Sequence, residues 1–96
     1  MKTLPRVYFK RFVEKHFLVE VAVFDIVDIH RYPNGIKYGL ICKNILTGAR
    51  VLFDNHFPKG DHFHIDDQEY DYQYVSYEIL YRDFETMVSE HFGVIL

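Results

Sequence analysis

The sequence is short of cysteine, of chain breakers and of long apolar runs. Its one cysteine, Cys42, excludes an internal disulfide, and the apolar residues around it favour a buried, inert thiol over a nucleophile. No apolar stretch reaches the roughly 20 residues that span a bilayer, and no apolar core follows the basic N-terminus as in a signal peptide. We therefore expect a protein of the reducing cytoplasm that has no membrane partner.

The motifs of nucleotide and redox enzymes are missing as well. The chain has no Walker loop, no Gly-x-Gly-x-x-Gly stretch and no pair of cysteines, so nucleotide, hydride and redox chemistry have no support. What remains is a composition of 49% hydrophobic and 18% aromatic residues, which is typical of one globular domain spanning residues 1–96. A domain of this size buries only about 60–65% of its unfolded surface, which leaves a homo-oligomer open.

Charge is distributed unevenly along the chain. The net charge is −3, but basic residues outnumber acidic ones at positions 1–16, and acidic residues outnumber basic ones at positions 66–96. Such segregation supplies a basic surface for phosphates or an acidic surface for a basic partner, and it is also common on ordinary solvated faces.

Alternating apolar residues predict an antiparallel sheet in the first two-thirds of the chain. The segment Tyr32–Gly35 combines proline with Asn-Gly and predicts a tight turn between two strands. The segment Asp66–Glu69 is predicted to be an acidic loop. The expected strands are Tyr8–Glu14, Phe17–His30 with a bend after Asp25, Lys37–Asn44, Arg50–Phe53 and His62–Ile65.

One amphipathic helix is expected near the C-terminus, from Ser76 or Tyr77 to about His91. Ser76 is a good N-cap, and Gly93 is well placed to end the helix. The predicted fold class is therefore α+β, a twisted antiparallel β-sheet with one C-terminal amphipathic helix packed on it. The apolar stripe that covers the sheet consists of Ile79, Leu80, Phe84, Met87, Val88 and Phe92.

The polar run at positions 54–64 is the strongest candidate for a functional site. It holds half of the six histidines around a turn made by Pro58 and Gly60, so the side chains on either side of the turn can converge. Histidines and a lysine near one another suit metal-independent RNA cleavage, with one imidazole as base, another as acid and the ammonium stabilising charge on phosphorus. The expected catalytic residues are His56, His62 and His64 for proton transfer, Lys59 for charge stabilisation, and Asp61 and Asp54 for orienting an imidazole.

Three neighbouring residues are expected to bind the substrate, and two other uses of the run compete with catalysis. Arg50, Tyr38 and Asn55 are the expected contacts to phosphate or to a base. In a metal site, His62 and His64 share one strand face and His56 or Asp61 adds a ligand. In a purely structural reading, Asp54-Asn55 forms a turn and Asp61 caps the loop. The adjacent Lys59 and the shortage of further ligands argue against an ion, so we expect no metal and no other cofactor.

The polar run and the segments around it resemble the TumE family of toxins. The resemblance rests on Asp54-Asn55-His56, on Lys59-Gly60-Asp61-His62-x-His64, on the acidic stretch at 66–69, on Ser76 and on Arg82-Asp83-Phe84. Phe57-Pro58 departs from the smaller or polar residues that members tend to have there. The resemblance implies a small growth-inhibiting toxin of a type II toxin–antitoxin module, neutralised by a cognate antitoxin protein.

The target chemistry does not follow from the resemblance. A ribonuclease that acts on RNA is the leading hypothesis, by analogy with other compact toxins. The alternative is a non-enzymatic toxin or protein-binding adaptor whose polar loop docks a partner.

Overall fold

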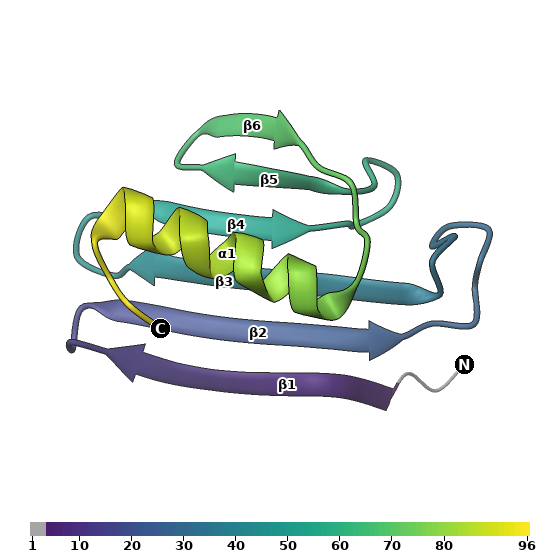
Figure 1. Ribbon diagram of the computed structural model, residues 1–96, viewed down its shortest axis with the longest axis horizontal. Coiled ribbons are helices and arrows are strands. Elements are labelled where there is room, and N and C mark those ends of the chain that lie inside the picture. The colour runs from purple at the N-terminus through teal and green to yellow at the C-terminus, as the bar shows by residue number, and fades with distance from the viewer. Residues whose placement is uncertain (1–3) are drawn as a thin grey trace.

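The computed structural model describes residues 4–96, which form an antiparallel sheet of six strands and one helix (Figure 1). The strands lie side by side in chain order, so each one pairs only with its neighbours in sequence. The helix α1 (Tyr77–Phe92) crosses one face of the sheet. The predicted α+β class is confirmed. The strands are β1 (Leu4–Val13), β2 (Phe17–Asp25), β3 (Ile36–Asn44), β4 (Arg50–Asp54), β5 (His62–Ile65) and β6 (Gln68–Asp71).

The hydrophobic core lies between α1 and the middle strands. Alternate residues of β2, Val19, Val21 and Val23, are fully buried, as the period of two in the sequence predicts. The helix contributes Leu80, Phe84 and Val88, which recur at helical spacing and are fully buried as well. Burying one such side chain contributes on the order of 1.5–3 kcal/mol.

Cys42 lies in this core, on the helix-facing side of β3. Its side chain is fully buried, and burial raises the pKa of the thiol to about 11. A thiol that is both inaccessible and protonated is a poor nucleophile. The predicted buried, inert cysteine is confirmed.

Three predicted boundaries differ from the structure by more than one residue. β1 begins at Leu4 and not at Tyr8, and β2 ends at Asp25 and does not continue to His30. Beyond Asp25 the chain leaves the sheet because the Asp28 carboxylate accepts hydrogen bonds from the backbone of the residues that follow, at 3.2 Å each, which makes a turn. The predicted acidic loop is wrong in its second half, since Gln68–Asp71 is the edge strand β6.

The predicted ends of the helix are confirmed. Ser76 Oγ accepts a hydrogen bond from the backbone N–H of Ile79 at 3.2 Å, as an N-cap does. Gly93 ends the helix with a left-handed φ of 70°, and its N–H donates to the Ser89 carbonyl. The tail then folds back on the core, where Val94 is buried, while Ile95 remains exposed.

The second face of the sheet is not covered by any helix or strand within residues 4–96. Along each strand the side chains alternate between the two faces, so the residues between core positions point to this open face. On β4 and β5 the core positions include Phe53 and Phe63, whose rings are stacked with their centres 4.7 Å apart. Asp54, His62 and His64 therefore belong to the open face.

Candidate functional site

The loop between β4 and β5 brings the polar run to one end of the open face. Asp54, the last residue of β4, is paired in register with His62, the first residue of β5. Asp54 Oδ1 accepts a hydrogen bond from the backbone N–H of His56 at 3.0 Å, which turns the chain away from the strand. Gly60 has a φ of 74°, a conformation that favours glycine, and it returns the chain to β5.

The loop encloses a hollow of about 330 Å³ together with the first residues of β5. Five of the six residues predicted to be catalytic line it, which is what the turn at Pro58 and Gly60 predicts. His56 and Lys59 are exposed on the loop, whereas the other predicted residues come from the strands. The lining residues are Asp54, His56, Phe57, Pro58, Lys59, His62 and His64.

His62 is the most constrained member of this group, with only 6% of the residue exposed. Its Nδ1 lies 2.7 Å from the Gly60 carbonyl oxygen. Because a carbonyl only accepts hydrogen bonds, Nδ1 carries the proton, and this fixes the tautomer. Nε2 then faces Asp54 Oδ1 at 3.4 Å. With the proton on Nδ1, Nε2 has none to donate, so the Asp54 carboxylate pairs with this imidazole only when Nε2 is protonated as well.

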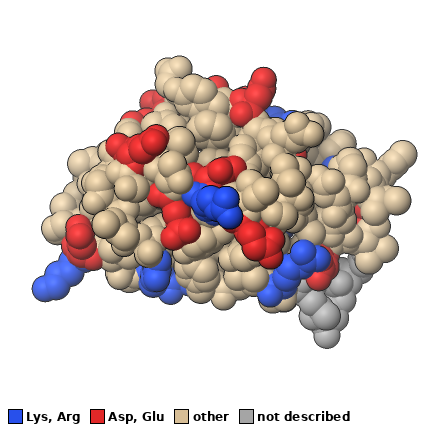
Figure 2. All heavy atoms as spheres, viewed as in Figure 1, with Lys and Arg blue, Asp and Glu red and all other residues tan. Residues whose placement is uncertain are grey.

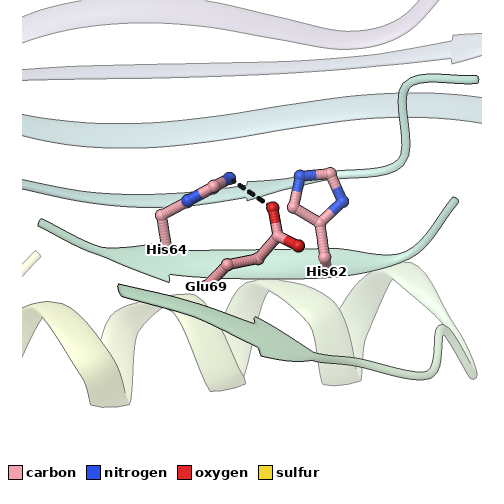
Figure 3. A group of neighbouring side chains, drawn as sticks. All are labelled: His62, His64 and Glu69. Carbon is pink, nitrogen blue, oxygen red and sulfur yellow. Dashed lines mark ion pairs between the residues drawn. The ribbon is translucent and has the colours of Figure 1, made fainter. Parts of the chain in front are cut away.

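His64 lies two residues along the same strand face, and it is paired in register with Glu69 of β6. Its Nε2 is 3.6 Å from Glu69 Oε1, and Lys59 Nζ donates to the same oxygen at 2.5 Å. The Lys59 ammonium beside Glu69 holds the pKa of that carboxyl below its ordinary value. The rings of His62 and His64 are 5.0 Å apart, and the Glu69 carboxylate lies between them (Figure 3).

Glu69 was not among the residues predicted for the site. The sequence places it in an acidic stretch that has no apolar alternation, so β6 gives no strand signal of its own. A two-residue turn at Asp66-Asp67 would pair His64 with Glu69, and the φ of 53° at Asp66 shows that such a turn exists. Glu69 could therefore have been assigned to the site from the turn at Asp66-Asp67, although not from a strand pattern.

Asp61 does not lie beside the histidines, contrary to the role predicted for it. Its Oδ1 accepts a hydrogen bond from the Tyr38 hydroxyl at 2.7 Å, and its Oδ2 accepts one from the backbone N–H of Tyr74 at 3.0 Å. No imidazole is among its hydrogen-bond partners. Asp61 ties the loop to β3 and to the segment before the helix, as the structural reading of this residue predicts.

Tyr38 and Asn55 are also placed differently from the substrate contacts that were predicted. Tyr38 is only 2% exposed, and burial together with Asp61 raises the pKa of its hydroxyl. Asn55 is 7% exposed; its Oδ1 accepts from the backbone N–H of Tyr38 and its Nδ2 donates to the carbonyl of Ile36, both at 2.9 Å. Tyr38 faces the interior because it lies on the core side of β3, and Asn55 does so because the loop packs against β3. Neither residue lines the hollow.

Arg50 lies on the open face but at the other end of β4. Asp54 lies four positions further along the strand, which corresponds to about 13 Å. Its backbone N–H donates to Asp66 Oδ1 at 2.9 Å, and its side chain lines a separate hollow near the β5–β6 turn. Arg50 is therefore outside the group of histidines.

Comparison with known proteins decides the family. Residues 3–92 of the chain match the family model described as Toxin TumE. The chain belongs to the Toxin TumE family. The match covers the sheet, the polar loop and α1, so it includes every residue of the site. The resemblance found from the polar run is confirmed.

Membership of the TumE family gives the protein a general role but not a mechanism. It indicates a toxin of a toxin–antitoxin module, with a cognate antitoxin as its partner. No curated protein and no solved structure matches the chain. Within residues 4–96, α1 is neither long nor apolar enough to cross a membrane.

Proposed function

We propose that this TumE-family toxin cleaves RNA phosphodiesters by acid–base catalysis, without a metal ion, in the hollow beside the β4–β5 loop. The observation that supports the proposal is the convergence of three imidazoles and one ammonium on a single hollow of the open face. These groups donate, accept and stabilise charge near neutral pH, which is what the reaction requires.

His62 is the general base in this proposal. Its Nδ1 proton is held by Gly60, and Nε2 accepts the proton of a ribose 2′-hydroxyl. The 2′-oxygen then attacks phosphorus, and the bond from phosphorus to the 5′-oxygen breaks, leaving a cyclic phosphate. The nearby Asp54 carboxylate stabilises the imidazolium that forms.

His56 or His64 returns a proton to the leaving 5′-oxygen, and Lys59 stabilises the negative charge on the phosphoryl oxygens. Each proton transfer of this kind contributes about 10²–10⁴-fold to the rate. Lys59 is held by Glu69 in the free protein, but its side chain is 60% exposed and its stem is flexible. The phosphate therefore competes with Glu69 for the ammonium.

Arg50 is the proposed contact to a more distant phosphate. It shares the open face of β4 with Asp54, two alternations along the strand. An extended RNA strand that enters the hollow and follows β4 would bring a second phosphate to this guanidinium. Arg50→Ala is then expected to weaken RNA binding more than it slows cleavage of bound RNA.

A partner-docking function is the alternative, and one observation favours it. Phe57, at the tip of the loop, is 45% exposed, and the Arg31 guanidinium lies 5.2 Å from the centre of its ring. An exposed aromatic residue next to an arginine is a common feature of protein interfaces. In this alternative Phe57 binds a cellular target, and the histidines serve only the fold.

The test is expression of histidine variants without antitoxin, combined with an RNA cleavage assay. We expect His62→Gln, and at least one of His56→Ala and His64→Ala, to lose at least about 100-fold in cleavage rate and to relieve growth arrest. His16→Ala and His30→Ala are matched controls, since both histidines are exposed and lie outside the hollow. Circular dichroism and thermal melting check that the His62 variant is folded.

A folded double variant His56→Ala/His62→Ala that still arrests growth would contradict the catalytic proposal. If Phe57→Asp alone abolished arrest in that situation, the docking alternative would be supported. RNA cleavage that persists in the double variant would likewise rule out these imidazoles as the acid and base.

A further inference from the structure

Two histidines and one carboxylate gather on adjacent strands at the centre of the site. We propose that His62, His64 and Glu69 form a binding site for one divalent transition-metal ion of the zinc type. The chain therefore has a metal site that shares two histidines with the proposed reaction, and the ion regulates that reaction. Regulation by the ion rests on the proposed function, whereas the metal site itself does not.

The spacing of the donor atoms fits such an ion. One ligand atom from each of the three residues lies within 4.8 Å of the other two. One pair of these atoms, His64 Nε2 and Glu69 Oε1, is 3.6 Å apart, and ligands of a tetrahedral zinc ion are separated by about 3.3 Å. Figure 3 shows the carboxylate between the two rings, so small side-chain rotations bring all three donors onto one point.

The surroundings of His62 are those of a metal-binding histidine. Ligating histidines commonly donate their second ring N–H to a backbone carbonyl, and the Gly60 carbonyl occupies this position at Nδ1. Nε2 is thereby left as the ligand atom. Asp54 Oδ1, 3.4 Å from Nε2, supplies either a fourth ligand or an acceptor for a bound water.

The backbone fixes the strand positions of the three residues before any ion arrives. His62 and His64 project from the same face of β5 because they are two residues apart, and register pairing places Glu69 opposite His64. Both histidine side chains are largely buried, at 8% and 17% exposure. Sites on paired strands lose little conformational freedom on binding, which favours affinity.

Lys59 is the group that opposes binding. Its ammonium occupies Glu69 Oε1, the oxygen that faces His64, and it places positive charge beside the ion. The side chain is exposed and leaves when an ion binds to the carboxylate.

Occupancy of the site has a direct chemical consequence. An ion on Nε2 of His62 holds the lone pair that the proposed reaction needs for the 2′-hydroxyl proton. The same ion also holds the lone pair on Nε2 of His64. A bound ion therefore stops cleavage, and its removal by a chelator restores cleavage.

The experiment is titration of the full chain, freed of metal with a chelator and dialysed, with Co²⁺ and Zn²⁺. We expect one ion per chain by calorimetry and the visible absorption of tetrahedral Co²⁺. His64→Ala and Glu69→Gln are expected to weaken binding at least tenfold. Lys59→Ala is expected to tighten it several-fold. His91→Ala is the matched control, because His91 Nε2 pairs with Asp66 Oδ2 at 3.1 Å, outside the three donors.

Several results would overturn the site. They are an absence of Co²⁺ or Zn²⁺ binding, equal affinity in Glu69→Gln and the unaltered chain, or a loss of binding in His91→Ala. Regulation is tested separately as the ratio of RNA cleavage rates with and without Zn²⁺, which should fall at least tenfold in the unaltered chain and approach one in Glu69→Gln. Stimulation by Zn²⁺ would overturn the inhibitory role.

The two proposals fail in distinguishable ways. A chain that binds Co²⁺ at these residues but cleaves no RNA would refute the proposed function and leave the metal site in place. A chain that cleaves RNA with catalytic histidines but binds no ion would refute the metal site alone.

Discussion

Two polar residues of the β4–β5 loop, Asn55 and Asp61, hold the loop in place. Each uses both ends of its side chain on groups in other segments: Asn55 on the backbone of β3, and Asp61 on Tyr38 and on the backbone at Tyr74. These contacts leave the histidines and Lys59 free to line the hollow. At the scale of the residue, the loop is therefore divided between residues that support it and residues that face a ligand.

Replacement of Asn55 by alanine should destabilise the fold. The change leaves the backbone N–H of Tyr38 and the carbonyl of Ile36 without their partner in a buried setting, and each such loss costs about 1–3 kcal/mol. We expect the free energy of unfolding, measured by urea denaturation, to fall by about 2–4 kcal/mol. Asn44→Ala is the control, because Asn44 accepts similar backbone hydrogen bonds in an exposed turn.

The control should cost less than about 1 kcal/mol, since water replaces the lost partner there. Equal losses of unfolding free energy in the two variants would show that burial does not increase the contribution of the Asn55 hydrogen bonds to stability.

The sequence reveals the composition of the site better than the direction of its side chains. The density of histidine around Pro58 and Gly60 predicts that His56, His62 and His64 converge, and they do line one hollow. Tyr38 and Asp61 were expected in the site but lie outside the hollow, because the direction of a side chain depends on strand register and loop packing. Both are set by contacts between segments distant in sequence, and no local pattern encodes them.

At the scale of the element, predictability follows hydrophobic alternation. β2 and β3 bury one face along their length, and α1 carries an apolar stripe with a cap at each end, so all three were identified. All four residues of β6 are exposed, and the strand is held mainly by its pairing with β5. Its first half, Gln68 and Glu69, has no apolar residue and no periodic signal, which is why these two residues were predicted to belong to an acidic loop.

The N-cap of α1 offers a test at this scale. Ser76→Ala removes the acceptor for the backbone N–H of Ile79 and should lower the free energy of unfolding by about 1 kcal/mol. Ser89→Ala, in the last turns of the same helix, is the matched control, and its change should lie within about 0.5 kcal/mol. Chemical denaturation measures both. A Ser76 variant as stable as the Ser89 variant would contradict the capping role.

At the scale of the whole molecule, the two faces of the sheet have different tasks. One face is closed by α1 over the core, and the other carries the hollow. Figure 2 shows the helix-bearing side, where Lys and Arg lie mainly at the centre and toward the β1 edge, while Asp and Glu are spread over the upper part, the centre and the lower edge. The segregation of charge along the sequence is therefore only partly visible on this face.

Stability of the whole fold should decline in alkali. Burial, and then hydrogen bonds to Asp61 and Asp83, raise the pKa values of Tyr38 and Tyr72. In the unfolded chain both hydroxyls ionise near pH 10, whereas in the folded chain they stay neutral, so their contribution to stability is complete below pH 10 and is lost as the pH rises above it. Urea denaturation at several values between about pH 8 and 11 should show this decline.

Tyr72→Phe should make the decline shallower, because it removes one of these two hydroxyls. Tyr8→Phe is the control, since Tyr8 lies outside the buried core and is 56% exposed. An identical pH dependence in all three proteins would rule out this linkage.

The order of the strands in the sheet has a consequence for how the chain acquires its structure. Every strand pairs with the one before it, so the sheet can assemble hairpin by hairpin with short loops to close. Docking of α1 on β3 and β4 is the step that joins segments far apart in sequence. Rapid zippering of local hairpins, followed by a slower capture of the C-terminal segment, is the kinetic signature expected of this topology.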